Sequence, residues 1–247
     1  MVHARARLGT GVQRGGGAAV VAAAALCMLC PALSDTESLR AQSPNGGSIT
    51  GHVTITSRVR GAALPAAAYS SRSVTVSRPP QVPELRNVVV YLKDVAYHGT
   101  PPPMRRQVRQ EQESFVPRVI AVTRGSIVDF PNGDAYFHNV FSLSTAASFD
   151  LGRFPNGQSR SWQFTKSGLV KVYCHIHSQM SASILVLDHP YFAVPDDAGA
   201  FVLGAVPPGD YRLVGWHERV GERTVPITVV AGQSASVELT LPVGDKR

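Results

Sequence analysis

Apolar residues recur along this chain in short runs, with polar residues at alternate positions. This period of two is typical of half-buried β-strands rather than of amphipathic helices. Strands are predicted at residues 48–55, 119–122, 127–130, 138–142, 162–164, 169–174, 184–187, 225–230 and 236–241. Residues 87–92 are apolar almost throughout, which favours a strand buried on both faces. Because 22 glycines and 18 prolines supply abundant turns, the pattern predicts an all-β chain.

The segments between these strands predict turns and several longer connections. Residues 35–46 are polar and read as a link, and residues 57–86 lack periodicity and read as a long loop with one weak strand near 74–76. Glycine and proline at 99–103 interrupt the chain before the second series of strands. Residues 149–157 predict a further loop.

Residues 1–34 have the order of a secretory leader. A basic start precedes an apolar run at 18–29 and small residues at 31–34, which suit cleavage. The apolar run is shorter than the ~20 residues that span a bilayer. We therefore expect export to the periplasm or the exterior, with the mature chain beginning after residue 34 or near Ala41. An uncleaved N-terminal membrane anchor is the alternative.

The charge of the chain is modest once this leader is set aside. The formal net charge of the 247 residues is +7, and three of the arginines lie in the leader, which leaves about +4. That balance is too small to indicate a nucleic-acid partner, and zinc-finger spacing and long basic helices are absent from the sequence. We expect no nucleic acid and no membrane contact beyond the leader.

The stretch 173–180, Tyr-Cys-His-Ile-His-Ser-Gln-Met, combines three soft or borderline metal ligands. Cys174, His177 and Met180 follow one another at intervals of three residues. By strand alternation Val170 shares a face with Cys174, so the thiol is expected at the end of a packed strand. A thiolate, an imidazole and a thioether this close together favour copper.

Cys174 is also the one cysteine outside the leader. Cys27 and Cys30 both lie within 1–34, so a chain without its leader could form no intramolecular disulfide. Metal ligation would explain why an exported protein has a single cysteine.

A second imidazole is available at His138, which Asn139 follows. With this pair the chain resembles the cupredoxin family of blue-copper electron carriers, and the Cys-x-x-His-x-x-Met spacing resembles its amicyanin type. The resemblance runs from about 115 to 187. It implies a Greek-key β-sandwich or barrel, a trigonal copper site of His138, Cys174 and His177, and a weak axial contact from Met180. It also implies that Asn139 ties the two ligand segments together.

Each of these residues also has a plainer interpretation. Cys174 and His177 could be a buried cysteine near a loop histidine, and His138 could cap the end of a strand. Met180 could fill the core, and Asn139 could be a turn residue. Strand alternation directs His175 away from the face of Cys174, so we expect it to face solvent.

Other chemistries fit the sequence less well. Zinc accepts one cysteine and two histidines but gains little from a thioether. A binuclear copper centre would need a second cysteine where Val170 stands. A hydrolase built on Cys174 and His138 would lack activation by a helix dipole.

The tail carries a second resemblance. Residues 196–213 contain Gly-x-Phe-x-Leu and a Pro-Pro-Gly-x-Tyr turn, which resemble the carboxypeptidase regulatory-like, or transthyretin-like, β-sandwich. Residues 49–53 and 88–92 resemble the beginning of the same pattern. This implies a small sandwich in two parts, at 45–103 and 190–243, with the copper domain at 104–189. Strands at 48–55 and 87–92 should then pair with strands after 196.

Taken together, these features predict an exported, non-enzymatic blue-copper protein that carries single electrons as copper cycles between Cu(I) and Cu(II). Its partners would be redox proteins. A loose cluster of arginines could steer an acidic partner or simply be solvated; its members are Arg105, Arg106, Arg109, Arg118 and Arg124. The alternatives are copper storage or delivery, and a structural or carbohydrate-binding-like sandwich.

Overall fold

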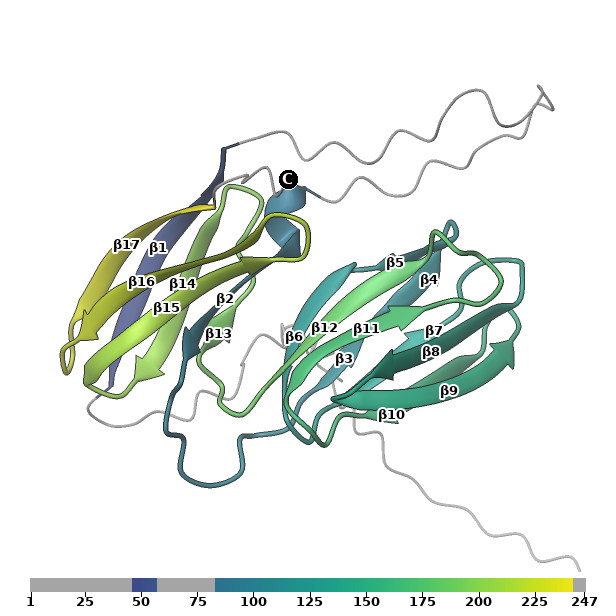
Figure 1. Cartoon of the computed structure of the whole chain (residues 1–247), viewed down its shortest axis with the longest axis horizontal. Helices are drawn as coiled ribbons and strands as arrows, with labels where there is room; N and C mark the ends of the chain where they lie inside the picture. Colours follow the sequence, from purple (N-terminus) through teal and green to yellow (C-terminus); the bar gives the residue numbers. More distant parts are fainter. Residues whose placement is uncertain (1–45, 57–82, 242–247) are drawn as a thin grey trace, which may run out of the picture. The chain divides into compact units, whose positions relative to one another are not determined.

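The computed structural model describes residues 46–56 and 83–241. The described chain is almost entirely strand, with one short 3-10 helix, so the all-β prediction is confirmed (Figure 1). Among these residues we find no helix with the length and apolar character to cross a bilayer. The predicted leader, the cleavage alternative at Ala41 and the weak strand near 74–76 lie outside the described residues.

Strands from the two ends of the chain form one β-sandwich, which we call the flanking sandwich. Its first sheet has the order β14-β1-β17, with β1 at Gly47–Ile55, β14 at Ala200–Val206 and β17 at Ser234–Leu241. Its second sheet has the order β13-β2-β15-β16, with bounds Phe192–Ala193, Val88–Lys93, Gly209–His217 and Gly221–Val229. The helix η1, Glu84–Asn87, leads into β2.

The core of the flanking sandwich consists of the inward residues of both sheets. Ile49, Val53 and Leu239 from the first sheet pack with Leu92 and Leu213 from the second, and all five are at most 1% exposed. Burying each aliphatic side chain stabilises the fold by about 1.5–3 kcal/mol. This apolar layer therefore holds together strands that are distant in sequence.

Strand pairing agrees with the split arrangement expected for this sandwich. β1 pairs with β14 antiparallel and with β17 parallel, and β2 pairs antiparallel with β15. β2 also pairs with β13, which lies before residue 196. The domain boundaries near 103 and 190 remain predictions.

The middle of the sequence forms a second β-sandwich, which we call the central sandwich. Its five-stranded sheet has the order β6-β12-β11-β8-β9, with bounds Val119–Thr123, Ser181–Leu187, Gly168–Tyr173, His138–Ser144 and Ala147–Phe154. Its three-stranded sheet has the order β10-β7-β3, with bounds Ser159–Gln163, Ile127–Pro131 and Arg105–Gln107. A hairpin joins β4, Arg109–Glu111, to β5, Ser114–Val116.

Alternating residues of these strands fill the central core. Val170 and Val172 of β11 are fully buried, whereas Leu169 and Tyr173 on the opposite face are more than a third exposed. From the facing sheet, Phe130 packs into the same cluster. The period-two prediction for this strand is therefore confirmed, and it carries the chain directly into Cys174.

The structure corrects several boundaries. The loop expected at 149–157 begins only after β9, because Ala147 and Phe149 are buried between exposed residues, as in a regular edge strand. Gly152, at φ 69°, and its polar neighbours gave this strand a turn-like sequence. Of the loop expected at 57–86, residues 57–82 lie outside the described residues, and residues 84–86 belong to η1. The sequence pattern did not indicate β3, whose residues are all exposed.

Candidate metal centre

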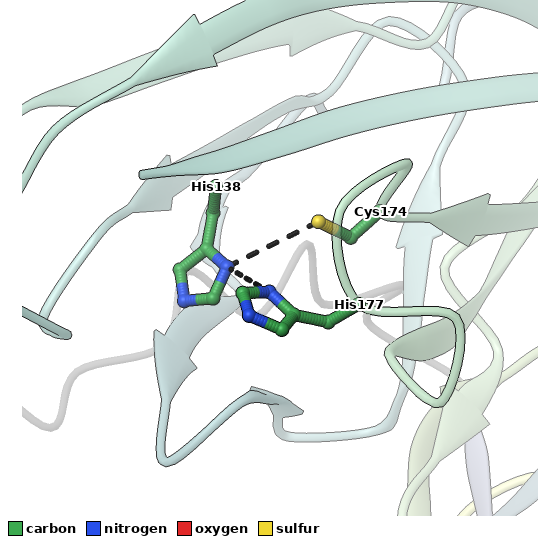
Figure 2. Close-up of side chains that lie close together, drawn as sticks. All are labelled: His138, Cys174 and His177. Atoms are coloured by element: carbon green, nitrogen blue, oxygen red, sulfur yellow. Dashed lines mark hydrogen bonds between the residues drawn. The ribbon is translucent and has the colours of Figure 1, made fainter. Parts of the chain in front are cut away.

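Three side chains of ligand type converge at one end of the central sandwich. The ligand atoms of His138, Cys174 and His177 all lie within 4.8 Å of one another. The two Nδ1 atoms of the histidines are 3.1 Å apart, and the Cys174 Sγ lies 4.0 Å from the Nδ1 of His138. Figure 2 shows the Nδ1 of His138 facing both of the other side chains. One ion could therefore contact all three.

Two paired strands position this group. His138 is the first residue of β8, and Cys174 directly follows β11. The two strands are neighbours, with Tyr173 opposite Phe141. His138 and Val140 face the core by alternation and are both fully buried, and Cys174 is 4% exposed.

The loop between β11 and β12 returns His177 to the same face. The backbone N–H of Met180 donates to the carbonyl oxygen of His177 at 3.0 Å, which closes the loop before β12. Met180 is 1% exposed and belongs to the same core cluster as Cys174. Its role as an axial ligand stays a prediction.

The intervening His175 lies on the other side of β8, as alternation predicted. Its side chain is 53% exposed, and its ring stacks on Phe141 at 3.7 Å between centroids. The backbone N–H of His175 donates to the Oδ1 of Asn139 at 3.3 Å, and the Nδ2 of Asn139 donates to Asp150 at 2.6 Å. Asn139 thus links the segment of His138 to the cysteine loop.

Hydrogen bonding favours the charged form of Cys174. Burial raises the pKa of its thiol, but hydrogen bonds from His138 and from the backbone of Asn139, His177 and Ile176 outweigh burial and lower the pKa to about 6. Burial lowers the pKa of His138, because it disfavours the charged imidazolium. Contacts with Cys174 and Asp134 raise this pKa, and the net direction is upward. A thiolate, the form that binds metals, is therefore accessible near neutral pH.

His177 is the member of the group nearest to solvent. Its side chain is 20% exposed, whereas that of His138 is fully buried. The Nε2 of His177 lies 3.9 Å from the Oε1 of Glu113, whose other oxygen accepts a hydrogen bond from Gln179 at 2.9 Å. The group is thus enclosed except at the edge of one imidazole.

Asp134 is a functional candidate that the sequence pattern did not reveal. Its Oδ2 lies 2.8 Å from the Nε2 of His138. In the sequence it appeared only as the last residue of a Pro-Asn-Gly-Asp turn. A carboxylate four residues before a ligand histidine is the one signal that could have found it.

Other residues singled out by sequence have ordinary partners. Four of the five arginines of the basic cluster pair with carboxylates, in Arg105–Asp129, Arg109–Glu111, Arg118–Glu218 and Arg124–Asp188. His189 and His217 are buried in packing roles.

The donor set suits copper. Two imidazole nitrogens and one thiolate form the trigonal His2Cys set of blue-copper sites, to which a weak axial thioether is commonly added. A structural zinc site would need a fourth strong ligand, and no further histidine, cysteine or carboxylate joins the group among the residues described.

No family model and no curated protein matches this chain. Among solved structures, a Cu-containing nitrite reductase from Thermus scotoductus SA-01 is 25% identical, with a TM-score of 0.32, over 37% of this chain and 24% of that one. A purple cupredoxin from Nitrosopumilus maritimus is 19% identical, with a TM-score of 0.30, over 33% of this chain and 98% of that one. An amicyanin from Paracoccus versutus is 18% identical, with a TM-score of 0.31, over 39% of this chain and 96% of that one.

This chain therefore spans about a quarter of the nitrite reductase, at 24%. Each similarity covers less than half of this chain. The assignment of the metal centre rests on the side-chain geometry described above.

Proposed function

We propose that this protein binds one copper ion through His138, Cys174 and His177, with Met180 as a weak axial ligand, and carries single electrons. The observation that supports this most is the convergence of two Nδ1 atoms and one Sγ within 4.8 Å in an enclosed site. Copper bound there would exchange one electron as it passes between Cu(I) and Cu(II).

The surrounding chain supplies what such a carrier needs. Cys174, with its pKa lowered to about 6, offers a thiolate to the metal without a large cost of deprotonation. The buried strand ends fix His138 and Cys174, so the ligands have little freedom to rearrange when the charge changes. His177 reaches solvent and offers an edge through which an electron can pass to a partner.

A carrier role is favoured over storage or delivery because the ligands are buried. Release of copper to another protein requires incoming ligands to reach the metal, and His138 and Cys174 are at most 4% exposed. We propose that the protein is not an enzyme, that its partners are redox proteins, and that it acts in the periplasm or outside the cell.

Loading the full chain with Cu(II) tests the site. A short bond between thiolate and Cu(II) gives an intense visible charge-transfer band, so the wild type should become strongly coloured at one equivalent. Cys174→Ser should remain nearly colourless, because a hydroxyl is a harder and weaker donor. Colourless copper binding by the wild type would contradict the carrier proposal and favour storage or delivery.

Stopped-flow mixing with a small redox reagent separates carrier from store. We expect the coloured protein to be reduced and reoxidised repeatedly without loss of metal. Release of copper on reduction would contradict the proposal even if the colour is present.

A further inference from the structure

Asp134 contacts the ring nitrogen of His138 that does not face Cys174. Its Oδ2 lies 2.8 Å from the Nε2, and its side chain is only 11% exposed. An ionised carboxylate can only accept hydrogen bonds, so this contact requires a proton on the Nε2 of His138. When this imidazole is neutral, as a metal ligand must be, the Nδ1, which faces Cys174 and His177, holds the lone pair that a metal needs.

Asp134 is held in place by hydrogen bonds at its backbone as well as at its carboxylate. Its backbone N–H donates to the Oδ1 of Asn132 at 2.9 Å, and its carbonyl oxygen accepts from the Nδ2 of Asn156 at 2.8 Å. Its carboxylate accepts from the backbone N–H groups of Gln112 at 2.6 Å and Glu113 at 2.9 Å. These contacts fix the carboxylate in place before any metal arrives.

The turn that supplies these two amides is unusual. Gln112 and Glu113 connect β4 to β5 with φ angles of 51° and 54°. Two-residue turns with positive φ at both positions normally use glycine, asparagine or aspartate, because other side chains are disfavoured there. The carboxylate of Asp134 accepts hydrogen bonds from both N–H groups of the turn and so offsets the cost of its disfavoured φ angles. The same turn places Glu113 beside the other ligand histidine, His177.

We propose that Asp134 is a positioning residue of the metal centre, which fixes His138 as an Nδ1 ligand and stabilises Cu(II) relative to Cu(I). This inference rests on the proposed copper function. A fixed negative charge beside a ligand stabilises the more positive ion more strongly, so Asp134 lowers the reduction potential. This largely buried carboxylate, held by the β4–β5 turn, makes the redox balance depend on a residue that does not touch the metal.

Asp134→Asn tests this with little change of shape. Glu111→Gln is the matched control, because it also removes one negative charge beside the same turn. Glu111 lies in β4, pairs with Arg109 at 2.8 Å and contacts none of the proposed ligands. Reduction potentials are measured by spectroelectrochemistry, and affinities for Cu(II) and Cu(I) by competition with chelators.

We expect Asp134→Asn to keep the thiolate colour and to weaken Cu(II) binding by about 10- to 100-fold, with a smaller effect on Cu(I). With Cu(I) affinity unchanged, that loss corresponds to a rise in potential of about 60 to 120 mV for one electron, and any loss of Cu(I) affinity makes the rise smaller. Glu111→Gln should leave both affinities within about twofold. Equal potentials for Asp134→Asn and Glu111→Gln would overturn the proposal.

A second measurement covers the case in which Asp134→Asn does not fold. Nitrogen-15 NMR of histidine in the metal-free wild type should show a slowly exchanging proton on the Nε2 of His138. A His138 protonated only at Nδ1 would overturn the inference. Because this readout needs no copper, its outcome is separate from that of the proposed function, which fails if the wild type gives no thiolate colour.

Discussion

His138 and His217 occupy similar positions in the two sandwiches and differ in the contacts of one ring nitrogen, Nδ1. Each lies at the end of a strand, each is fully buried, and each has its Nε2 near a carboxylate, at 2.8 Å from Asp134 and 3.2 Å from Glu84. The Nδ1 of His217 accepts backbone N–H groups from residues 219 and 220, both at 3.3 Å. The Nδ1 of His138 faces Cys174 and His177 instead.

This difference separates a structural histidine from a candidate ligand. The protein itself satisfies both nitrogens of His217, so nothing is left for a metal. Burial lowers the pKa of His217, with Glu84 opposing it, whereas the contacts of His138 raise its pKa. Burial and a carboxylate partner therefore do not identify a ligand; the environment of the second nitrogen does.

The largest expected effect is the difference in copper affinity between variants of His138 and of His217. His138→Ala should weaken Cu(II) binding by more than about 100-fold, because even the loss of a partner behind a ligand costs 10- to 100-fold. His217→Gln should retain full affinity and colour, since it lies in the flanking sandwich and contacts no ligand. Competition titrations measure both. Equal losses of copper in the two variants would show that the comparison between them is wrong.

A smaller effect is expected at the cysteine loop, where His177 and His175 form a second such pair. His177→Ala should open an equatorial position at the solvent edge of the site, change the visible spectrum and allow added imidazole to restore it. His175→Ala should leave the spectrum almost intact, because its ring stacks on Phe141 on the other side of β8. A bleached His175→Ala protein with an unchanged His177→Ala protein would reverse our assignment within the loop.

Sequence patterns predicted the parts of the site that depend on alternation and spacing. Strand period two predicted that Cys174 faces inward and His175 outward, and the cupredoxin resemblance, through its Cys-x-x-His-x-x-Met spacing, indicated His177. Asp134 could not be predicted in the same way. Its contact with His138 depends on the path of a turn, on Asn132 and Asn156, and on the amides of hairpin residues 22 and 21 positions earlier in the chain.

The fold shows the same division between local and long-range information. Alternation located most strands, and the two-part resemblance indicated which ones pair across the sequence. The short exposed strand β3 and the edge strand β9 were not predicted. The residues of β3 are all exposed, so no apolar alternation marked that strand, whereas the buried Ala147 and Phe149 of β9 were masked by Gly152 and its polar neighbours.

The smallest expected effect concerns stability and pH. The folded-state pKa of His217 is lowered, so the unfolded chain, near its ordinary pKa of ~6.5, binds more protons at mildly acidic pH. The contribution of His217 is therefore present above about pH 6.5 and is lost as the pH falls below it. His217→Gln should destabilise the metal-free chain by about 1–3 kcal/mol, because buried N–H groups lose their acceptor.

Urea unfolding between pH 5 and 8 measures this dependence. The difference in unfolding free energy between wild type and His217→Gln should be larger at pH 8 than at pH 5. A difference that grows toward acid would mean that His217 is charged in the folded protein.

X-ray absorption at the copper edge tests the central claim most directly, because it counts the atoms bound to the metal. For the Cu(II)-loaded full chain we predict one short bond to sulfur and two imidazoles. The sulfur signal should disappear in Cys174→Ser, and one imidazole should be lost in His138→Ala. His217→Gln should keep the sulfur and both imidazoles. A wild-type spectrum without a short copper–sulfur bond, or an unchanged imidazole count in His138→Ala, would contradict the account.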